Sequence, residues 1–282
     1  MNNRTRLRLI ATGACAATLL PLAAHAARNW LLPSSTNVTG NNAWVTVDAA
    51  GSDDLFHFDH NALDLEGLKI YAPDGTLVAA QNKTTSKFRS TFDVQLNKPG
   101  TWRISLLNDN AIASYTVGTE SKRARGTMAS IRQQIPADAT EVAVTRTETR
   151  FDVFVTSGKP SDTMLKPTGA GLELVAYSHP TDLVAGDKAS FGLVFDGKPA
   201  VGAAVTVIRG GNRYRDQLGD IRIVADKDGR FSVTWPEAGM YWLNATYPPR
   251  AEGETPAAAP GGTVDAPARR ATYTATLEVA TP

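Results

Sequence analysis

The chain has 282 residues, of which 42% are hydrophobic and 20% are charged, and its 29 basic side chains nearly balance its 28 acidic ones. Nucleic-acid-binding domains need a basic excess or a basic stripe, so this balance argues against nucleic acid as a partner. The length corresponds to about two domains, at about 100 to 200 residues per domain.

The amino-terminal segment 1–26 has the three parts of a secretory signal peptide. A basic start with three arginines is followed by an apolar region and by the small-residue cleavage site Ala-His-Ala. The apolar region is too short to span a bilayer, which takes about 20 apolar residues. The pattern therefore predicts export and a mature chain that begins at Ala27, although cleavage after Ala24 would instead leave His25 at the amino terminus.

Cys15 is the only cysteine, and it lies inside this leader. A lipoprotein anchored at Cys15 is the alternative interpretation, but Thr12 stands where a leucine is usual. If the leader is removed, the exported chain has neither disulfides nor thiolate metal ligands.

Short runs of alternating apolar and polar residues, separated by Gly, Pro, Asn and Asp, follow one another along the rest of the chain. They include AWVTVDA, FDVQL, TWRISLL, FDVFVT, FSVTW and TYTATLEV. This spacing predicts an all-β fold of antiparallel β-sandwiches. The one convincing helical pattern is Gly126–Ile135, ended by Pro136, and we expect it to be a short connecting helix.

The stretch LFHFDH, Leu55 to His60, carries two of the four histidines of the chain. Treated as a strand, it places Leu55, His57 and Asp59 on one face and the two phenylalanines, pointing inward, on the other. An imidazole and a carboxylate at this spacing can meet one divalent ion, and His60 joins them if the strand ends or bulges. The alternative is a solvated charge pair with His60 at a turn.

His179 is a weaker candidate for a further ligand. Pro180 follows it and holds it in an extended conformation, and it lies near the expected boundary between two modules, where it could face the first. The sequence thus predicts a divalent transition-metal site of His57, Asp59, His60 and His179, without distinguishing nickel, cobalt, iron, copper and zinc.

An internal repeat predicts two modules. The segment FDVQLNKPGTWRISL aligns with FSVTWPEAGMYWLNA, with Gly100 on Gly239 and Trp102 on Tyr241. The matched apolar residues fall on the same face of the expected strand in both segments. Such a match is typical of a buried face and a tight glycine turn. We expect one β-sandwich over residues 27–159 and a second over 160–282.

The segment 248–270 is rich in Pro, Ala and Gly and low in bulky apolar residues. It cannot bury enough surface to order itself, so we expect a mobile loop in the second module.

The sequence contains no cysteine nucleophile outside the leader, no GxSxG and no HExxH. We therefore expect a protein that is not an enzyme. A contact loop at RYRD, Arg213 to Asp216, would serve a structural or interaction module, since Tyr and Arg are favoured at interfaces. A plain surface turn with a local Arg–Asp pair is the alternative.

The phrases WLLPSS, AWVTVDAAGSDDLFHFDH, LKPTGAGLELVAYSHPTDLVAGD, GGNRYRD and DGRFSVTWPEAGMYWLNA together resemble the bacterial periplasmic proteins of the domain of unknown function 4198 family. The second module also resembles transthyretin-like or carboxypeptidase-regulatory-like sandwiches, and the fold class expected is two tandem immunoglobulin-like or transthyretin-like modules. In that family a histidine often precedes the tryptophan by a few residues, whereas Ala27, Arg28 and Asn29 precede Trp30 here.

The resemblance implies a periplasmic accessory protein of nickel, cobalt or iron acquisition that binds a metal, a metal chelate or a transport partner. It implies an outer-membrane receptor or inner-membrane transport or reductase components as partners. The alternative is a periplasmic interaction module that binds no metal.

Overall fold

The computed structural model describes residues 27–40, 42–249 and 261–282, so the expected leader lies outside the described residues. The fold is all-β, as predicted, and consists of three sheets. The described ranges contain no helix that is long and apolar enough to cross a membrane.

The first sheet belongs to the amino-terminal half of the chain. In spatial order it consists of β1 (Arg28–Pro33), β3 (Ala43–Ser52), β8 (Ser90–Leu96) and β7 (Gln81–Thr85), with β4 (Asn61–Ala62) beside β3. The third sheet belongs to the carboxy-terminal half. It consists of β12 (Leu172–Ala176), β14 (Lys188–Phe195) and β15 (Lys198–Pro199), with β18 (Arg230–Thr234) beside β14.

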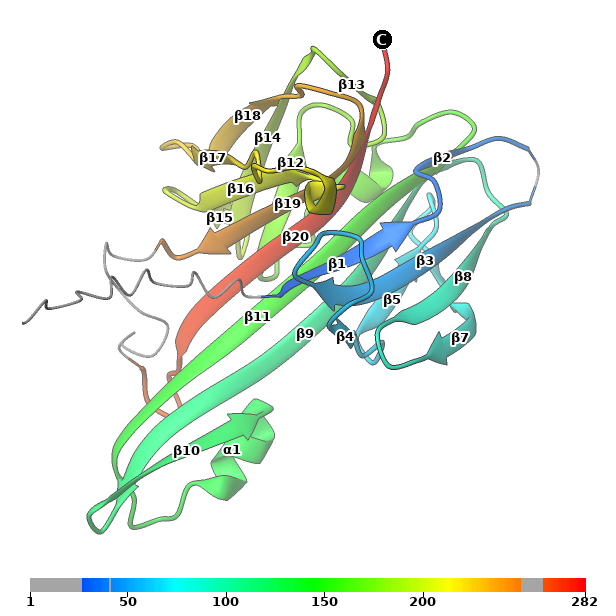
Figure 1. Cartoon of the computed structure of the whole chain (residues 1–282). Helices are drawn as coiled ribbons and strands as arrows, with labels where there is room; N and C mark the ends of the chain where they lie inside the picture. The colour runs from blue at the N-terminus through cyan, green and yellow to red at the C-terminus, as the bar shows by residue number, and fades with distance from the viewer. Residues whose placement is uncertain (1–26, 41, 250–260) are drawn as a thin grey trace, which may run out of the picture.

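The second sheet runs through both halves, and we call it the shared sheet (Figure 1). Its strands, in spatial order, are β17 (Ile221–Val224), β16 (Ala204–Arg209), β19 (Gly239–Tyr247), β20 (Ala268–Ala280), β11 (Thr140–Ser157), β9 (Gly100–Val117), β5 (Leu68–Tyr71) and β6 (Leu77–Val78). Three strands join it at the side: β10 (Glu120–Gly126) on β9, β2 (Asn37–Val38) on β11 and β13 (Leu183–Val184) on β20.

The same strand order occurs in both halves. In the first half β2, β11, β9, β5 and β6 face the sheet of β1, β3 and β8, and in the second half β13, β20, β19, β16 and β17 face the sheet of β12, β14 and β18. One hydrophobic core contains residues between Leu31 and Val155, and another contains residues between Leu172 and Val279. The module limits 27–159 and 160–282 stay a prediction.

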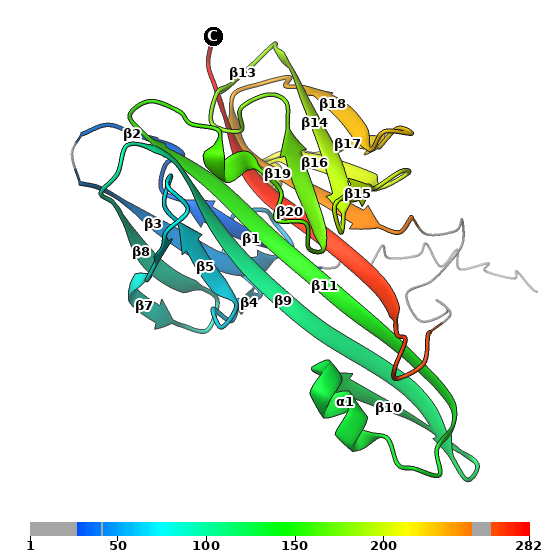
Figure 2. The ribbon, with the colours of Figure 1, turned by 180° about the vertical axis from the view of Figure 1, so that it is seen from behind.

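The two halves are joined because β11 and β20 pair in parallel, with Phe151 opposite Thr274. Residues paired across a ladder point to the same face, and their neighbours point to the other. Phe151 belongs to the first core, whereas Tyr273, next to Thr274, belongs to the second. The two sandwiches therefore lie on opposite faces of the shared sheet, as Figure 2 also shows.

In each half the glycine turn of the repeat is a corner between two sheets and does not join paired strands of one sheet. β8 pairs with β3 while β9 pairs with β11, so the chain changes sheet at Gly100, and it does so again between β18 and β19 at Gly239. Both glycines have positive φ, 126° and 139°. The Trp102 indole donates to the Lys98 carbonyl at 3.0 Å and the Tyr241 hydroxyl donates to the Glu237 carbonyl at 2.7 Å. Other β-sandwiches have a similar tyrosine corner, in which an aromatic side chain hydrogen-bonds to the backbone a few residues upstream.

β9 and β11 continue beyond both sandwiches as a long ribbon that carries β10 and the helix α1 (Met128–Gln134) (Figure 2). The helix begins after Thr127, whose side chain accepts a hydrogen bond from the Ser130 amide, and it buries Ile131 against Ala113 and Val144. Two single turns of 3-10 helix complete the described structure, η1 (Thr163–Leu165) and η2 (Asn212–Tyr214).

The loop expected over 248–270 is described only in part, because residues 250–260 lie outside the described ranges. The mobility of this segment stays a prediction, and the described residues 261–270 make contacts with the long strands and the helix. Gly262 exchanges two backbone hydrogen bonds with Val144, and Asp265 accepts from Arg132 at 2.7 Å.

Candidate binding site

The segment Leu55 to His60 is not a strand, so that part of the prediction is wrong. It is the loop between β3 and β4, and Phe56 within it has a φ of 66°, which a bulky residue adopts only under tertiary constraint. The alternation of faces assumed for His57 and Asp59 therefore does not apply.

The aromatic residues of this loop pack on Trp30 of β1. The ring centroids of Phe56 and Phe58 lie 5.4 and 5.6 Å from that of Trp30. Phe56 is half-buried, but Phe58 keeps 37% of its surface exposed, with the guanidinium of Arg89 over its ring. The expectation that both rings point inward therefore holds only for Phe56.

The residues proposed as metal ligands lie in two different places. The His57 ring contacts the Tyr214 ring at 5.9 Å, and Asp59 accepts a hydrogen bond from the Asp53 amide at 3.3 Å. His60 is exposed. Within the described part of the chain no three His, Cys, Asp or Glu residues form a group that could hold an ion.

His179 lies between the two halves, in a chain of hydroxyl groups. Its Nε2 is 3.1 Å from the Thr101 hydroxyl, and its Nδ1 is 3.1 Å from the Thr181 hydroxyl. Both ring nitrogens thus have hydrogen-bond partners within the protein. The assignment of His57, Asp59, His60 and His179 as ligands stays a prediction.

The loop 53–60 meets the loop that carries RYRD. Asn212 accepts a hydrogen bond from the Leu55 amide at 2.8 Å and donates to the Asp54 carboxylate at 3.1 Å. Phe56 packs over Gly210 so closely that a Cβ at this position would lie 2.6 Å from its ring. Two segments far apart in the sequence are therefore fitted to each other.

RYRD does not form the local Arg–Asp pair of the surface-turn alternative, and its role as a contact loop stays a prediction. Arg215 donates to three backbone carbonyls, those of Arg209, Gly210 and Leu218, and so holds the loop closed. Tyr214 stands out from the loop with 77% of its surface exposed.

Below these loops a small core joins the two halves. It contains Trp30, Ala50, Leu55, Ile208 and Trp242. The indole of Trp30 donates to the Ser52 hydroxyl at 2.8 Å, and that of Trp242 donates to the Asn29 carbonyl at 3.0 Å. Most of the phrases that carry the family resemblance contribute residues to this core or to the two loops above it.

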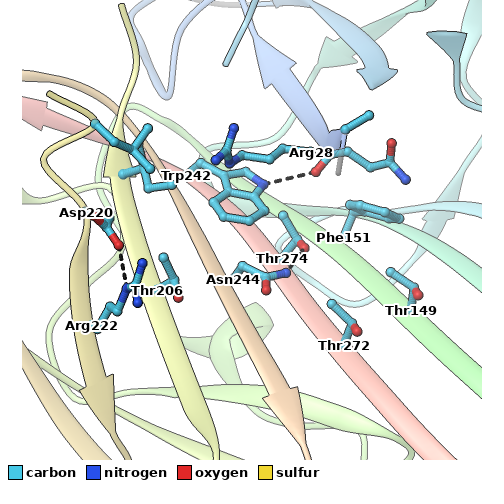
Figure 3. Close-up of a pocket in the computed structure, with 14 residues that line it drawn as sticks. Arg28, Thr149, Phe151, Thr206, Asp220, Arg222, Trp242, Asn244, Thr272 and Thr274 are labelled. Atoms are coloured by element: carbon cyan, nitrogen blue, oxygen red, sulfur yellow. Dashed lines mark hydrogen bonds and ion pairs between the residues drawn. The ribbon is translucent and has the colours of Figure 1, made fainter. Parts of the chain in front are cut away.

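A groove of about 650 Å³ opens beside this core, between the start of β1 and the shared sheet (Figure 3). We call it the junction groove. Its floor consists of side chains that are in register across neighbouring strands. The lining residues are Ala27, Arg28, Asn29, Thr149, Phe151, Thr206, Ile208, Leu218, Asp220, Arg222, Trp242, Asn244, Thr272 and Thr274.

The polar groups of the junction groove are hydroxyls, an amide and charges of both signs. Asn244 lies between Thr206 and Thr274 in the ladder and donates to the Thr274 hydroxyl at 3.0 Å. Arg222 donates to Asp220 at 2.6 Å, and this hydrogen bond lowers the pKa of Asp220. Such a lining can bind a compact polar molecule by hydrogen bonds, with Trp242 as an apolar wall.

The sequence carries a signal for this groove that the strand analysis did not use. In TYTATLEV the small apolar and aromatic residues alternate with Thr272 and Thr274, which indicates one polar face. That this face is left open depends on the pairing of β20 with β11, which no local pattern predicts.

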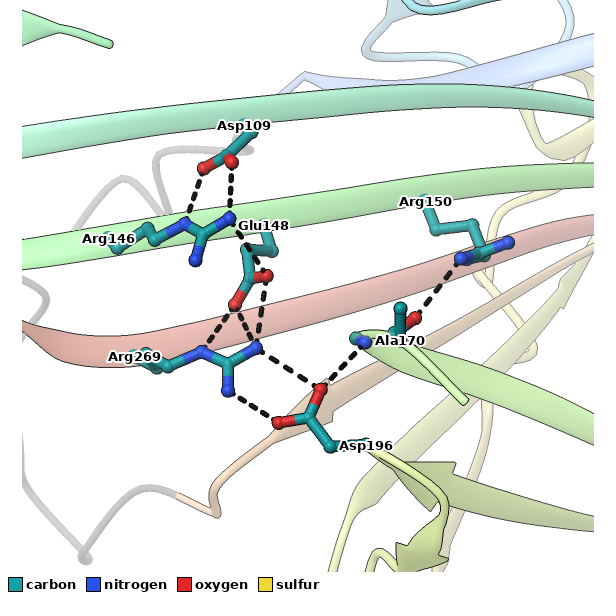
Figure 4. Close-up of polar contacts among 8 residues, drawn as sticks. Asp109, Arg146, Glu148, Arg150, Ala170, Asp196 and Arg269 are labelled. Atoms are coloured by element: carbon teal, nitrogen blue, oxygen red, sulfur yellow. Dashed lines mark hydrogen bonds and ion pairs between the residues drawn. The ribbon is translucent and has the colours of Figure 1, made fainter. Parts of the chain in front are cut away.

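The opposite face of the shared sheet carries a charge network (Figure 4). Arg269 donates to Glu148 at 2.7 Å and also to Asp196, and Arg146 donates to Asp109 at 2.8 Å. These hydrogen bonds raise the pKa of Arg269 and lower that of Asp196. Every charge named here has a partner, so the network serves the packing of the two halves.

The segment that links the halves is held on this face by Glu173. Its carboxylate accepts from the amides of Thr168, Gly169 and Ala170 at 2.7 to 3.2 Å and lies 3.5 Å from Arg150. Both members of the ion pair are buried, and their removal one at a time would leave an uncompensated charge.

A family model described as "Domain of unknown function (DUF4198)" matches residues 24–248. No curated protein matches the chain. Among solved structures, a DUF4785 family protein from Legionella pneumophila is 10% identical with a TM-score of 0.22, over 76% of this chain and 50% of that one. The D0-D1 domain of intimin is 12% identical with a TM-score of 0.22, over 89% and 97%.

The ICAM-5 D1-D4 ectodomain fragment is 10% identical with a TM-score of 0.21, over 90% of this chain and 51% of that one. The chain thus spans about half the length of the Legionella and ICAM-5 structures. These similarities are too low to carry an argument about function.

Proposed function

Because the chain belongs to the DUF4198 family, we propose that it is a periplasmic, non-enzymatic accessory protein of transition-metal acquisition, for nickel, cobalt or iron. We further propose that it takes the metal as a complex with an organic ligand, in the junction groove. The observation that supports this proposal is the groove itself, formed where the two halves meet.

The size of the junction groove suits a small organic complex. Its volume of about 650 Å³ lies within the range of about 300 to 1,000 Å³ that is usual for ligand pockets. Residues from β1, β11, β16, β19 and β20 contribute to it, so a bound molecule would touch both halves of the chain.

The lining chemistry suits the oxygen atoms of such a complex better than a bare ion. Guanidinium, amide and hydroxyl groups donate hydrogen bonds to carboxylate or hydroxamate oxygens. First-row transition metals bound directly by proteins prefer imidazole, thiolate and carboxylate ligands. Among the described lining residues Asp220 is the one carboxylate, and it accepts a hydrogen bond from Arg222.

The test is calorimetry of the mature chain with nickel, cobalt and ferric ions, each as the free ion and as its citrate complex, together with quenching of the tryptophan fluorescence, to which Trp242 contributes. We expect at least one complex to bind and to lose about tenfold or more in affinity in Asn244→Ala and Arg222→Gln. Lys227→Gln removes the same charge from an exposed residue of the same half and should leave binding unchanged. Equal affinity in all variants would contradict the proposal that the metal complex binds in the junction groove.

The surface of loops 53–60 and 210–216 favours a second candidate function, that of an interaction module. Tyr214 is 77% exposed and Phe58 37%, and both stand on loops that are fixed by Asn212 and Arg215. Fixed aromatic residues are favoured at the centre of interfaces. Partners of the kind the resemblance implies are the outer-membrane receptor or an inner-membrane reductase of the same bacterium.

This alternative is tested by binding of the purified receptor or reductase to the chain. We expect Tyr214→Ser to weaken such binding, whereas Leu77→Ser, at a position that is 64% exposed on β6, should not. If Tyr214→Ser binds the partner with the same affinity as the wild type, this surface is not the interface.

A further inference from the structure

A second pocket, of about 310 Å³, lies further along the same face of the shared sheet, at the root of the long ribbon. We call it the ribbon pocket. Thr272 lines both it and the junction groove. The lining residues are Ile112, Ser114, Arg123, Arg125, Ala143, Thr145, Thr147, Thr246, Tyr247, Pro248, Gly261, Arg270, Ala271 and Thr272.

Strand register explains why two arginines of β10 point into this pocket. Arg123 pairs with Ser114 and Arg125 pairs with Ile112 across β9. Ala124, between them, is buried in the cluster that packs against α1 on the other face. Because neighbouring residues of a strand alternate, Arg123 and Arg125 lie together on the face opposite the helix.

The described lining of the ribbon pocket contains three arginines and no acidic residue. The arginines are surrounded by hydroxyl groups, those of Ser114, Thr145, Thr147, Thr246 and Thr272. Glu141 lies one row further along the ribbon, where its carboxylate accepts from the Thr116 hydroxyl at 2.9 Å. Arg123 and Arg125 therefore bring positive charge to the pocket, and the hydroxyl groups beside them can donate further hydrogen bonds.

On the other face of the shared sheet the charged side chains form ion pairs. There Arg146 and Arg269 are paired with Asp109, Glu148 and Asp196 (Figure 4), and Lys122 of β10 lies 3.5 Å from Glu120. The cations named on that face thus have acidic partners. On the opposite face, Arg123 and Arg125 of β10 border a concave surface.

We propose that the ribbon pocket binds a small oxyanion with more than one negative charge, either a polycarboxylate or a phosphate. A planar guanidinium donates two parallel hydrogen bonds to a carboxylate or phosphate, and threonine hydroxyls supply further donors. A volume of about 310 Å³ suits a compact anion of this kind. This site is separate from the junction groove and requires no metal.

The experiment is calorimetry of the metal-free mature chain with citrate, tricarballylate, inorganic phosphate and pyrophosphate at about 0.15 M salt. We expect one of the two classes, polycarboxylate or phosphate, to bind more tightly than about 1 mM, and the difference between the arms assigns the class. Arg125→Gln should lower the affinity about tenfold, and the pair Arg123→Gln with Arg125→Gln should abolish measurable binding.

The matched control is Lys122→Gln, which removes the same charge from the same strand but from the face that carries α1. It should leave anion affinity unchanged. If none of the four anions binds more tightly than about 1 mM, or if Lys122→Gln weakens binding as much as Arg125→Gln, the proposal is wrong. Neither result depends on whether the junction groove binds a metal complex.

Discussion

Trp242 of β19 donates its indole N–H to the backbone carbonyl of Asn29 at the start of β1, at 3.0 Å and across 213 positions of the chain. This hydrogen bond fixes the first strand of one half to the shared sheet of the other. The junction groove opens directly beside it, so the position of β1 determines whether the groove exists (Figure 3).

Trp242→Phe should therefore destabilise the protein by about 1 to 3 kcal/mol, because the Asn29 carbonyl loses its donor and the small core between the halves loses contact area. Urea unfolding followed by circular dichroism measures this change. Trp44→Phe is the matched control, since Trp44 is 47% exposed, and it should change stability by less than about 0.5 kcal/mol. Equal effects of the two substitutions would show that the hydrogen bond to Asn29 contributes nothing.

Tyr241→Phe should destabilise the second half by about 1 kcal/mol. The substitution removes the hydroxyl that donates to the Glu237 carbonyl at 2.7 Å and leaves the ring in place against Trp235. Tyr214→Phe removes a hydroxyl from an exposed ring and should have no effect. An unchanged unfolding midpoint in Tyr241→Phe would mean that Gly239 and packing alone set this corner.

The repeat predicted which residues occupy equivalent positions around the two glycine turns. Gly100 and Gly239 align in the repeat, and an aromatic residue follows each of them by two positions. Each aromatic side chain donates to a backbone carbonyl four residues upstream, so both occupy the same position relative to the turn. The sequence could not predict that the chain changes sheet there instead of forming a hairpin. That outcome depends on which strands β8 and β18 find as partners.

The loop 55–60 could not be predicted from its own residues. Its alternation of apolar and polar side chains is typical of a strand, but Leu55 is bonded to Asn212 and Phe56 packs over Gly210, more than 150 positions away in the sequence. Tertiary contacts override the local pattern here. The arginines of the ribbon pocket were missed for a similar reason, since only the pairing of β9 with β10 brings Arg123 and Arg125 to one side.

Acid should weaken the contact between Arg269 and Asp196. Arg269 lowers the pKa of Asp196 below its usual value of 3.8, so the pair contributes stability that is fully present above pH 3.8 and is lost as the pH falls through the folded-state pKa. Asp196 is 41% exposed, so after solvent screening this contribution is below about 1 kcal/mol.

The measurement compares the unfolding free energy of the wild type with that of Arg269→Gln between pH 7 and pH 2.5. We expect the difference to be largest at neutral pH and to shrink below pH 3.8. Arg222 lowers the pKa of Asp220, as Arg269 lowers that of Asp196. Arg222→Gln therefore serves as a parallel case on the opposite face of the sheet. A difference that stays constant over the whole range would show that charge on Asp196 is not involved.

Export should remove residues 1–26, so that intact-mass analysis of protein from the periplasm gives a chain that starts at Ala27. Both Ala27 and Arg28 line the junction groove, so the new amino terminus would belong to its lining. A start at His25 would instead supply a free amine and an imidazole that can bind one ion together, and the prediction of cleavage after residue 26 would then be wrong.

Free divalent ions should bind only weakly to the loop 53–60. His57 and Asp59 offer two donors, whereas a closed zinc-type site takes four. His179, the further ligand predicted from the sequence, is held by Thr101 and Thr181 instead. We expect a Kd of about 1 mM, or roughly −4 kcal/mol, for at least one of nickel, cobalt, copper, zinc and ferrous iron.

Calorimetry with these five ions on the wild type and on His57→Ala, Asp59→Ala and His60→Ala tests this prediction. Binding should be lost in His57→Ala and should weaken in acid, because an imidazole must be neutral to bind a metal. Asp138→Ala, at an exposed position between α1 and β11, should bind as the wild type does. Micromolar binding that survives all three loop substitutions would place the metal site elsewhere in the chain, and the loop would then remain only as part of the surface around Tyr214.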